Sequence, residues 1–92
     1  MKKIEFTVTG EPLIGGFVDV EGIVTTDEDP RPPAVPIRYD DHVIRMPVAD
    51  GVLQLHVEFP TESTVTIAPG DDYEGAKLVL RADRPVAVDP EP

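Results

Sequence analysis

Ser63, His42 and His56 are the first candidates for nucleophilic chemistry, because the chain contains no cysteine. Ser63 is the single serine, and it is not part of a Gly-x-Ser-x-Gly elbow. A general base must lie within hydrogen-bond reach of its nucleophile. The residues around the two histidines supply no such partner. We therefore predict no catalytic residues and interpret the chain as a protein that is not an enzyme.

Carboxylates are the other reactive groups, and they gather in three clusters along the chain. These clusters are Asp27, Glu28 and Asp29; Asp40 and Asp41; and Asp71, Asp72 and Glu74. Glycoside hydrolysis needs two carboxyls across a cleft, one with a raised pKa, and the hydration of a turn opposes such a shift. Ca²⁺ needs about six to eight oxygen ligands, and the third cluster lacks the spacing of an EF-hand loop. Because Asp side chains cap turns, the clusters are typical of turns, and we predict no metal and no cofactor.

Residues 27–36 form the most proline-rich segment. Four prolines in this stretch cannot donate hydrogen bonds to a sheet, so an extended, polyproline-like surface loop is predicted. An exposed, stiff segment of this kind is a candidate site for binding a partner protein. The candidate residues are Asp27, Glu28, Asp29, Pro30, Arg31, Pro32 and Pro33.

The charge balance argues against two classes of partner. Eighteen Asp and Glu residues face eight Lys and Arg residues, which gives a formal net charge of −10. Nucleic-acid phosphates and anionic membrane surfaces are both bound by basic patches. We therefore expect no direct contact with nucleic acid and none with a membrane, whereas cationic partners are favoured.

No segment of the chain has the pattern of a membrane span or an export signal. No apolar run approaches the roughly 18–20 residues that cross a bilayer. The first residues, 1–6, contain two lysines and then alternate, whereas a signal peptide needs an uninterrupted apolar stretch there. We expect a cytoplasmic protein, or one that lies within a viral or multi-protein assembly.

Alternation of apolar and polar residues dominates the chain, whereas helical periodicity is nearly absent. Pro and Gly separate short alternating runs at spacings of about 8–12 residues. No segment offers the crossover helix that parallel strands need. The pattern predicts one all-β domain over residues 1–88: a small antiparallel β-sandwich, immunoglobulin-like in outline, or a closed barrel, with about seven to eight short strands. Residues 89–92 are expected to form a frayed acidic, proline-rich tail.

The inward positions of these runs define the expected core. The expected core residues are Ile4, Phe6, Val8, Val18, Val20, Ile44, Leu53, Leu55, Val57, Phe59, Val65, Ile67, Leu78 and Leu80. Gly22 interrupts the alternation of its run, which is typical of a β-bulge, and Ile23 would then take the inward role.

Asp50 and Gly51 carry the clearest local signal. Asp-Gly between two alternating runs favours a type I′ turn, because both positions need a positive φ. If the flanking runs pair as a hairpin, His56 lies opposite Arg45 and not opposite His42. The two histidines would then share no metal site.

Tyr73 lies near the start of the penultimate run. Its position resembles the tyrosine corner of immunoglobulin-like sandwiches. The cysteines and the tryptophan of immunoglobulin domains are absent, so the resemblance concerns architecture alone and identifies no family.

Two classes of function remain. The first is a structural or protein-interaction module, such as a component of a viral particle or multi-protein assembly, that binds another protein or its own copies. Binding would use an edge strand or the proline-rich loop. The second is an acidic mimic of nucleic acid that occupies a basic groove on an enzyme. In that case the outward acids Glu5, Asp19, Glu21 and Glu58 would form one negative face together with the loop clusters.

Overall fold

The computed structural model describes residues 2–10, 15–58, 61–81 and 84–89 of the chain. These residues form eight β-strands, which confirms the all-β prediction. The strands are β1 (Lys3–Thr9), β2 (Phe17–Thr25), β3 (Ala34–Tyr39), β4 (His42–Pro47), β5 (Val52–Glu58), β6 (Thr64–Pro69), β7 (Lys77–Arg81) and β8 (Arg84–Asp89).

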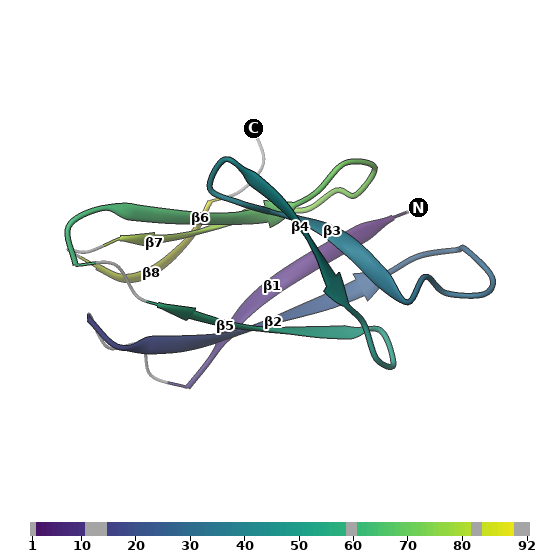
Figure 1. The fold of residues 1–92 in the computed structure, drawn as a ribbon, viewed down its shortest axis with the longest axis horizontal. Helices are drawn as coiled ribbons and strands as arrows, with labels where there is room; N and C mark the ends of the chain where they lie inside the picture. The colour runs from purple at the N-terminus through teal and green to yellow at the C-terminus, as the bar shows by residue number, and fades with distance from the viewer. Residues whose placement is uncertain (1, 11–14, 59–60, 82–83, 90–92) are drawn as a thin grey trace.

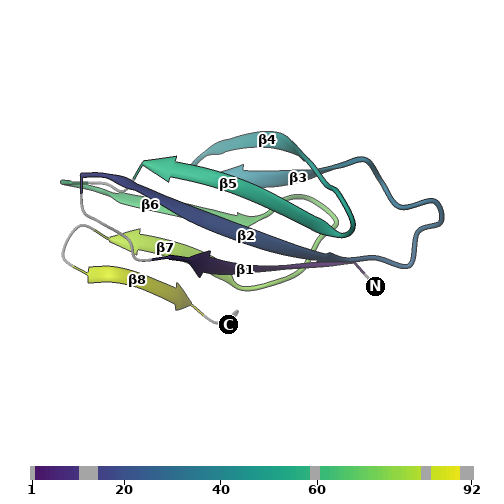
Figure 2. The ribbon, with the colours of Figure 1, turned by 90° about the horizontal axis from the view of Figure 1, so that it is seen from below.

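The strands form two sheets that pack face to face (Figures 1 and 2). One sheet has the order β1-β2-β5 and the other the order β4-β3-β6-β7-β8, and neighbouring strands are antiparallel. The fold is therefore a small β-sandwich and not a closed barrel. β1, β2 and β5 take the places of strands A, B and E of an immunoglobulin-like sandwich, and β3, β6 and β7 take those of C, F and G.

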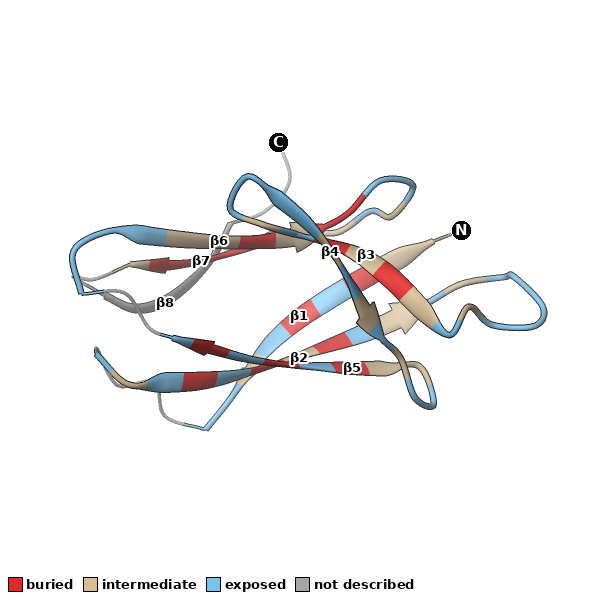
Figure 3. Ribbon diagram, viewed as in Figure 1, coloured by how far each residue is buried: buried red, intermediate tan, exposed pale blue. Residues whose placement is uncertain are grey.

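The core lies between the two inner faces, and buried residues alternate with more exposed ones along β1, β2 and β5 (Figure 3). Ten of the expected core residues are buried: Ile4, Phe6, Val18, Val20, Leu53, Leu55, Val57, Ile67, Leu78 and Leu80. Val8, Ile44 and Val65 are half-buried against them. Phe59 lies outside the described residues. The core prediction omitted Val35, Ile37 and Val79, all of which are buried.

Gly22 is not a bulge, because the register of β2 runs unbroken past it on both sides. It lies on the inward face, opposite Phe6 and Leu53, so Val24 continues the inward alternation and Ile23 points outward. A Cβ at position 22 would lie 2.9 Å from the Leu53 side chain. The glycine is therefore explained by the space that Leu53 occupies, and the predicted inward role of Ile23 is wrong.

The Asp50-Gly51 turn is confirmed, but the hairpin predicted from it is wrong. Both residues have positive φ, 55° and 77°, and Ala49 and Val52 exchange two hydrogen bonds of 3.0 Å. Beyond that pair the strands diverge: β4 pairs with β3, whereas β5 pairs with β2 in the other sheet. The turn therefore carries the chain between sheets, and His56 lies opposite Asp19 and not opposite Arg45.

Pro36 lies inside β3, so the proline-rich segment is a loop only up to Pro33. Its carbonyl accepts a 2.9 Å hydrogen bond from Gly70 N–H on the β6 side of the strand. At position 36, any residue other than proline would have an N–H that could donate to the Gly70 carbonyl. That carbonyl instead accepts a 3.2 Å hydrogen bond from Tyr73 N–H. The N–H of Tyr73 therefore replaces the donor that Pro36 lacks, and the Gly70 carbonyl stays paired.

The turn between β6 and β7 joins the two sheets. Glu74 exchanges two main-chain hydrogen bonds of 2.9 Å with β1, donating to the Lys2 carbonyl and accepting from Ile4 N–H. Gly75 follows with a φ of 145°, and a Cβ there would collide with the Ile4 carbonyl oxygen. Tyr73 lies in this turn and not at the start of β6, so it is not at the tyrosine-corner position.

We expect Gly75→Ala to lower the free energy of unfolding by about 3 kcal/mol or more, because both the backbone conformation and the contact with β1 are lost. Gly51→Ala is the matched control, since its φ is also positive but its Cβ would make only ordinary contacts of 3.5 Å. That variant should lose roughly 1–2 kcal/mol. Urea denaturation measures both values. Equal losses would contradict the role given to the Glu74 connection.

Candidate functional site

The outward side chains of β1, β2 and β5 form the surface that we call the acidic face. The strands alternate in burial along their whole length, so one side of the three-stranded sheet packs on the core and the other is exposed to solvent. The four acids predicted to form one negative face all lie on this exposed side: Glu5, Asp19, Glu21 and Glu58.

These four acids form a diagonal row across the acidic face. Asp19 and Glu21 are two residues apart on β2, which separates them by about 7 Å. Glu5 lies opposite Ile23 and is therefore the diagonal neighbour of Glu21. Glu58 stands in the same relation to Asp19, since Asp19 pairs with His56. Diagonal neighbours in antiparallel sheets are about 7–8 Å apart, so the four positions follow one another along the sheet at similar backbone spacing.

An aromatic pair lies beside this row. The rings of Phe17 and His56 stack with centroids 4.4 Å apart and planes inclined by 12°. His56 is held from the other side by Asp19, whose carboxylate oxygen lies 2.7 Å from Nδ1. Although Phe17 packs on His56, 56% of its surface is exposed. Sequence reasoning missed this cluster because it assigned β5 the wrong partner strand.

The acidic face also carries exposed apolar surface. Phe17 and Ile23 belong to it, and Val43 on β4 is the third large apolar residue that is exposed among those described. The negative charges of the acidic face are compensated only in part. Lys3 pairs with Glu5 at 2.6 Å. The carboxylates of Glu21 and Glu58 form neither an ion pair nor a hydrogen bond with the described part of the chain. Phe17 and Ile23 lie six residues apart on β2, so Phe17 is the exposed apolar group next to Asp19 and Glu58.

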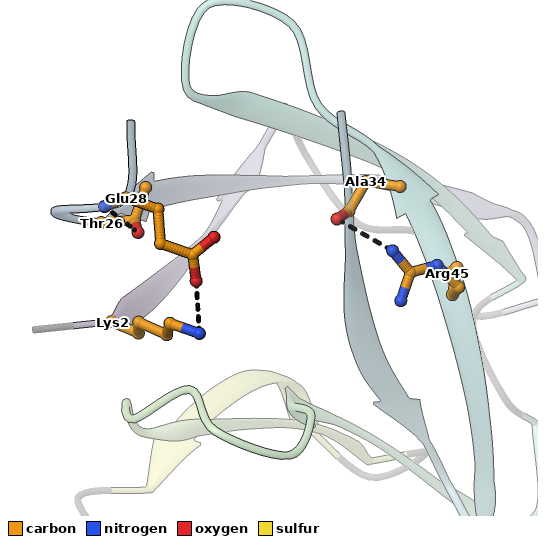
Figure 4. Close-up of polar contacts among 5 residues, drawn as sticks. All are labelled: Lys2, Thr26, Glu28, Ala34 and Arg45. Atoms are coloured by element: carbon orange, nitrogen blue, oxygen red, sulfur yellow. Dashed lines mark hydrogen bonds and ion pairs between the residues drawn. The ribbon is translucent and has the colours of Figure 1, made fainter. Parts of the chain in front are cut away.

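The proline-rich loop is fixed at its acidic end. Glu28 N–H donates a 3.1 Å hydrogen bond to Thr26 Oγ1, and the Glu28 carboxylate pairs with the Lys2 ammonium (Figure 4). The hydrogen bond to Glu28 raises the pKa of Lys2 above its ordinary value. The Lys2 ammonium also lies 5.7 Å from the centre of the Tyr73 ring. The structure therefore brings Glu28 to the start of β1 and the β6–β7 turn, and not to the acidic face.

Further contacts bind this part of the chain to its surroundings. In β4, the guanidinium of Arg45 donates a 3.3 Å hydrogen bond to the carbonyl of Ala34, the first residue of β3 after the loop (Figure 4). Arg31 lies against the Gly51 turn, where its Nη1 would be 3.5 Å from a Cβ at that glycine. The remaining loop candidates, Asp27, Asp29, Pro30, Pro32 and Pro33, lie between these contacts along the chain.

The turn acids have structural roles, as their sequence context predicted. Asp40 has a φ of 55°, and its carboxylate accepts a 2.9 Å hydrogen bond from Thr66 N–H. Asp71 pairs with Arg38 at 3.0 Å. Asp72 adopts a φ of 71°, and the main chain of Glu74 holds β1. The described residues contain no group of three or more potential ligands placed to hold a metal ion.

His42 and His56 lie in different sheets, so the structure does not bring them together. His42 is exposed beside the β3–β4 turn, with Nε2 3.4 Å from the carboxylate of Asp41. No polar or charged side chain is buried in the part of the chain that the structure describes. Open hollows of about 430 and 300 Å³ flank the β6–β7 turn. Their lining includes Glu74 and Glu5 but neither histidine.

Comparisons of the chain with protein-family models, with curated proteins and with solved structures find no match. A search of the described residues for a helix long and apolar enough to cross a membrane finds none.

We expect Phe17→Ala to change the free energy of unfolding by less than about 1 kcal/mol, because the ring is mostly exposed and only its stacking on His56 is lost. Phe6→Ala is the control, since Phe6 is 7% exposed and packs in the core. That variant should lose about 3–5 kcal/mol. Thermal or urea unfolding compares the two. A large loss of unfolding free energy in Phe17→Ala would mean that the ring stabilises the fold, and it would contradict a role in binding a partner.

Proposed function

We propose that this chain is a non-enzymatic protein-interaction module, of the kind that serves as a component of a multi-protein assembly. Its working surface is the acidic face of the three-stranded sheet. The observation that carries the proposal is Phe17, an exposed aromatic ring that stacks on His56, with Glu58 opposite it on β5 and Asp19 two residues along β2. Aromatic residues of this kind often supply most of the binding energy at protein interfaces.

The separation of the reactive groups supports the non-enzymatic part of the proposal. His42 and His56 are exposed and belong to different sheets, and His56 is engaged with Asp19. The turn acids, in contrast, take part in hydrogen bonds and turns that the fold itself requires. The acids of the acidic face are the better candidates for a partner, since the carboxylates of Glu21 and Glu58 make no hydrogen bond to the described residues.

Phe17→Ala should weaken binding to partner proteins by at least about tenfold, because truncating a central aromatic contact costs about 2 kcal/mol or more. The immobilised protein would capture partners from an extract of the organism that encodes it, and retention would be quantified by mass spectrometry. Val43→Ala is the matched control, because Val43 is exposed to a similar extent, 53% against 56%, on the other sheet. Equal retention by both variants would contradict the assignment of the working surface.

A second candidate function, an acidic mimic of nucleic acid, rests on the diagonal row of Glu5, Glu21, Asp19 and Glu58. A row of carboxylates can replace phosphates in the basic groove of a nucleic-acid-binding enzyme. Such binding is governed by charge, so it is screened by salt over about 10 Å at 0.1 M. This property separates the mimic from a module that binds mainly through Phe17.

If the mimic is correct, double-stranded DNA should displace the captured partner, and the double variant Glu21→Lys/Glu58→Lys should lower affinity by about a hundredfold. The control is Asp41→Lys/Asp71→Lys, which changes the net charge by the same amount at exposed positions in turns of the other sheet. Binding that resists DNA and salt but requires Phe17 would contradict the mimic and favour the module.

A further inference from the structure

β5 is an edge strand whose outward main-chain groups are open along most of its length. Val24 N–H donates a 2.8 Å hydrogen bond to the Gly51 carbonyl, so position 51 and every second residue after it face β2. The alternate residues Gln54, His56 and Glu58 therefore direct their N–H and C=O groups away from the sheet. Val52 is already engaged with Ala49.

The other edges with described side chains are protected over part of their length. Glu74 covers the start of the β1 edge with two hydrogen bonds. β4 ends in Pro47, which has no N–H to offer at the free edge. Proline and charge are devices that prevent strand addition at an edge. β5 lacks both at Gln54 and His56, and Figure 1 shows β4 and β5 diverging from the turn that joins them.

We propose that the free edge of β5 binds an extended basic segment of a partner protein, which adds to the three-stranded sheet as a fourth strand. The inference deepens the proposed function and rests on it. A strand added beside β5 alternates its side chains between the two faces. Lysines or arginines on one side would lie beside the acids of the acidic face. Apolar residues on the other side would extend the row of Leu53, Leu55 and Val57.

The charges distinguish this partner from a second copy of the chain. Two β5 strands paired antiparallel about His56 would place both copies' Asp19, Glu21 and Glu58 on one continuous face. Each copy carries a formal net charge of −10, so like charges would oppose this pairing. A basic segment gains from the same carboxylates, because complementary potentials favour association.

The test uses a synthetic octapeptide in which lysine alternates with valine, and a glutamate–valine octapeptide as its counterpart. The lysine peptide should slow hydrogen exchange of the Gln54, His56 and Glu58 amides by at least about tenfold, since strand addition engages them directly. Gln54→Pro, which removes an outward N–H and no bond to β2, should weaken peptide binding by about tenfold or more. Val43→Pro is the control, because it makes the same change at the outward edge of β4.

Each other outcome overturns the inference in a recognisable way. Peptide binding that survives Gln54→Pro but is lost in Glu21→Lys/Glu58→Lys would place the peptide on the acidic face, which contradicts strand addition but leaves the proposed function intact. Equal binding of the glutamate peptide would contradict the basic partner. A dimer in native mass spectrometry that Gln54→Pro abolishes would make a second copy the occupant. No binding of the lysine peptide also overturns the inference, whereas the capture experiment with Phe17→Ala judges the proposed function separately.

Discussion

The exchange of main-chain hydrogen bonds between Glu74 and the start of β1 joins the two sheets on the side away from β5. It requires the sharp backbone of Gly75, and it brings Lys2 to the Tyr73 ring and to Glu28. Because this connection occupies part of the β1 edge, it makes the two edges of the three-stranded sheet unequal. The open edge is then β5, beside the acidic face.

The sequence shows which side chains of each strand point into the core, but it does not show which strands are neighbours in a sheet. Alternation at Leu53, Leu55 and Val57 is enough to place one side of β5 in the core, since a strand can bury only every second residue. The Asp50-Gly51 turn, however, satisfies its local geometry whether the following strand pairs with β4 or crosses to the other sheet. That choice depends on how two whole sheets pack, and no short segment records it.

The same limit explains which parts of the candidate site could be predicted. Parity alone shows that Asp19, Glu21 and Glu58 point outward, but only the pairing of β2 with β5 brings Asp19 and Glu58 together. The contact of Phe17 with His56 depends on the β2–β5 register and could not be found while β5 was assigned to β4. Gly22 was misinterpreted for a related reason, because the side chain that excludes a Cβ there comes from Leu53 on the partner strand.

The acidity of the chain has two different physical origins. Asp40 and Asp72 adopt the positive φ that their turns need, and the Asp40 carboxylate accepts a hydrogen bond from Thr66 N–H. Turns favour Asp whatever the function of the protein. The carboxylates of Glu21 and Glu58 have no such local task, and strands as a rule disfavour Glu. Their position beside an open edge gives them a consequence that the turn acids lack: in the proposal made above, they oppose pairing with another copy of the same edge and favour a cationic chain. The net charge would then restrict what the open β5 edge can bind.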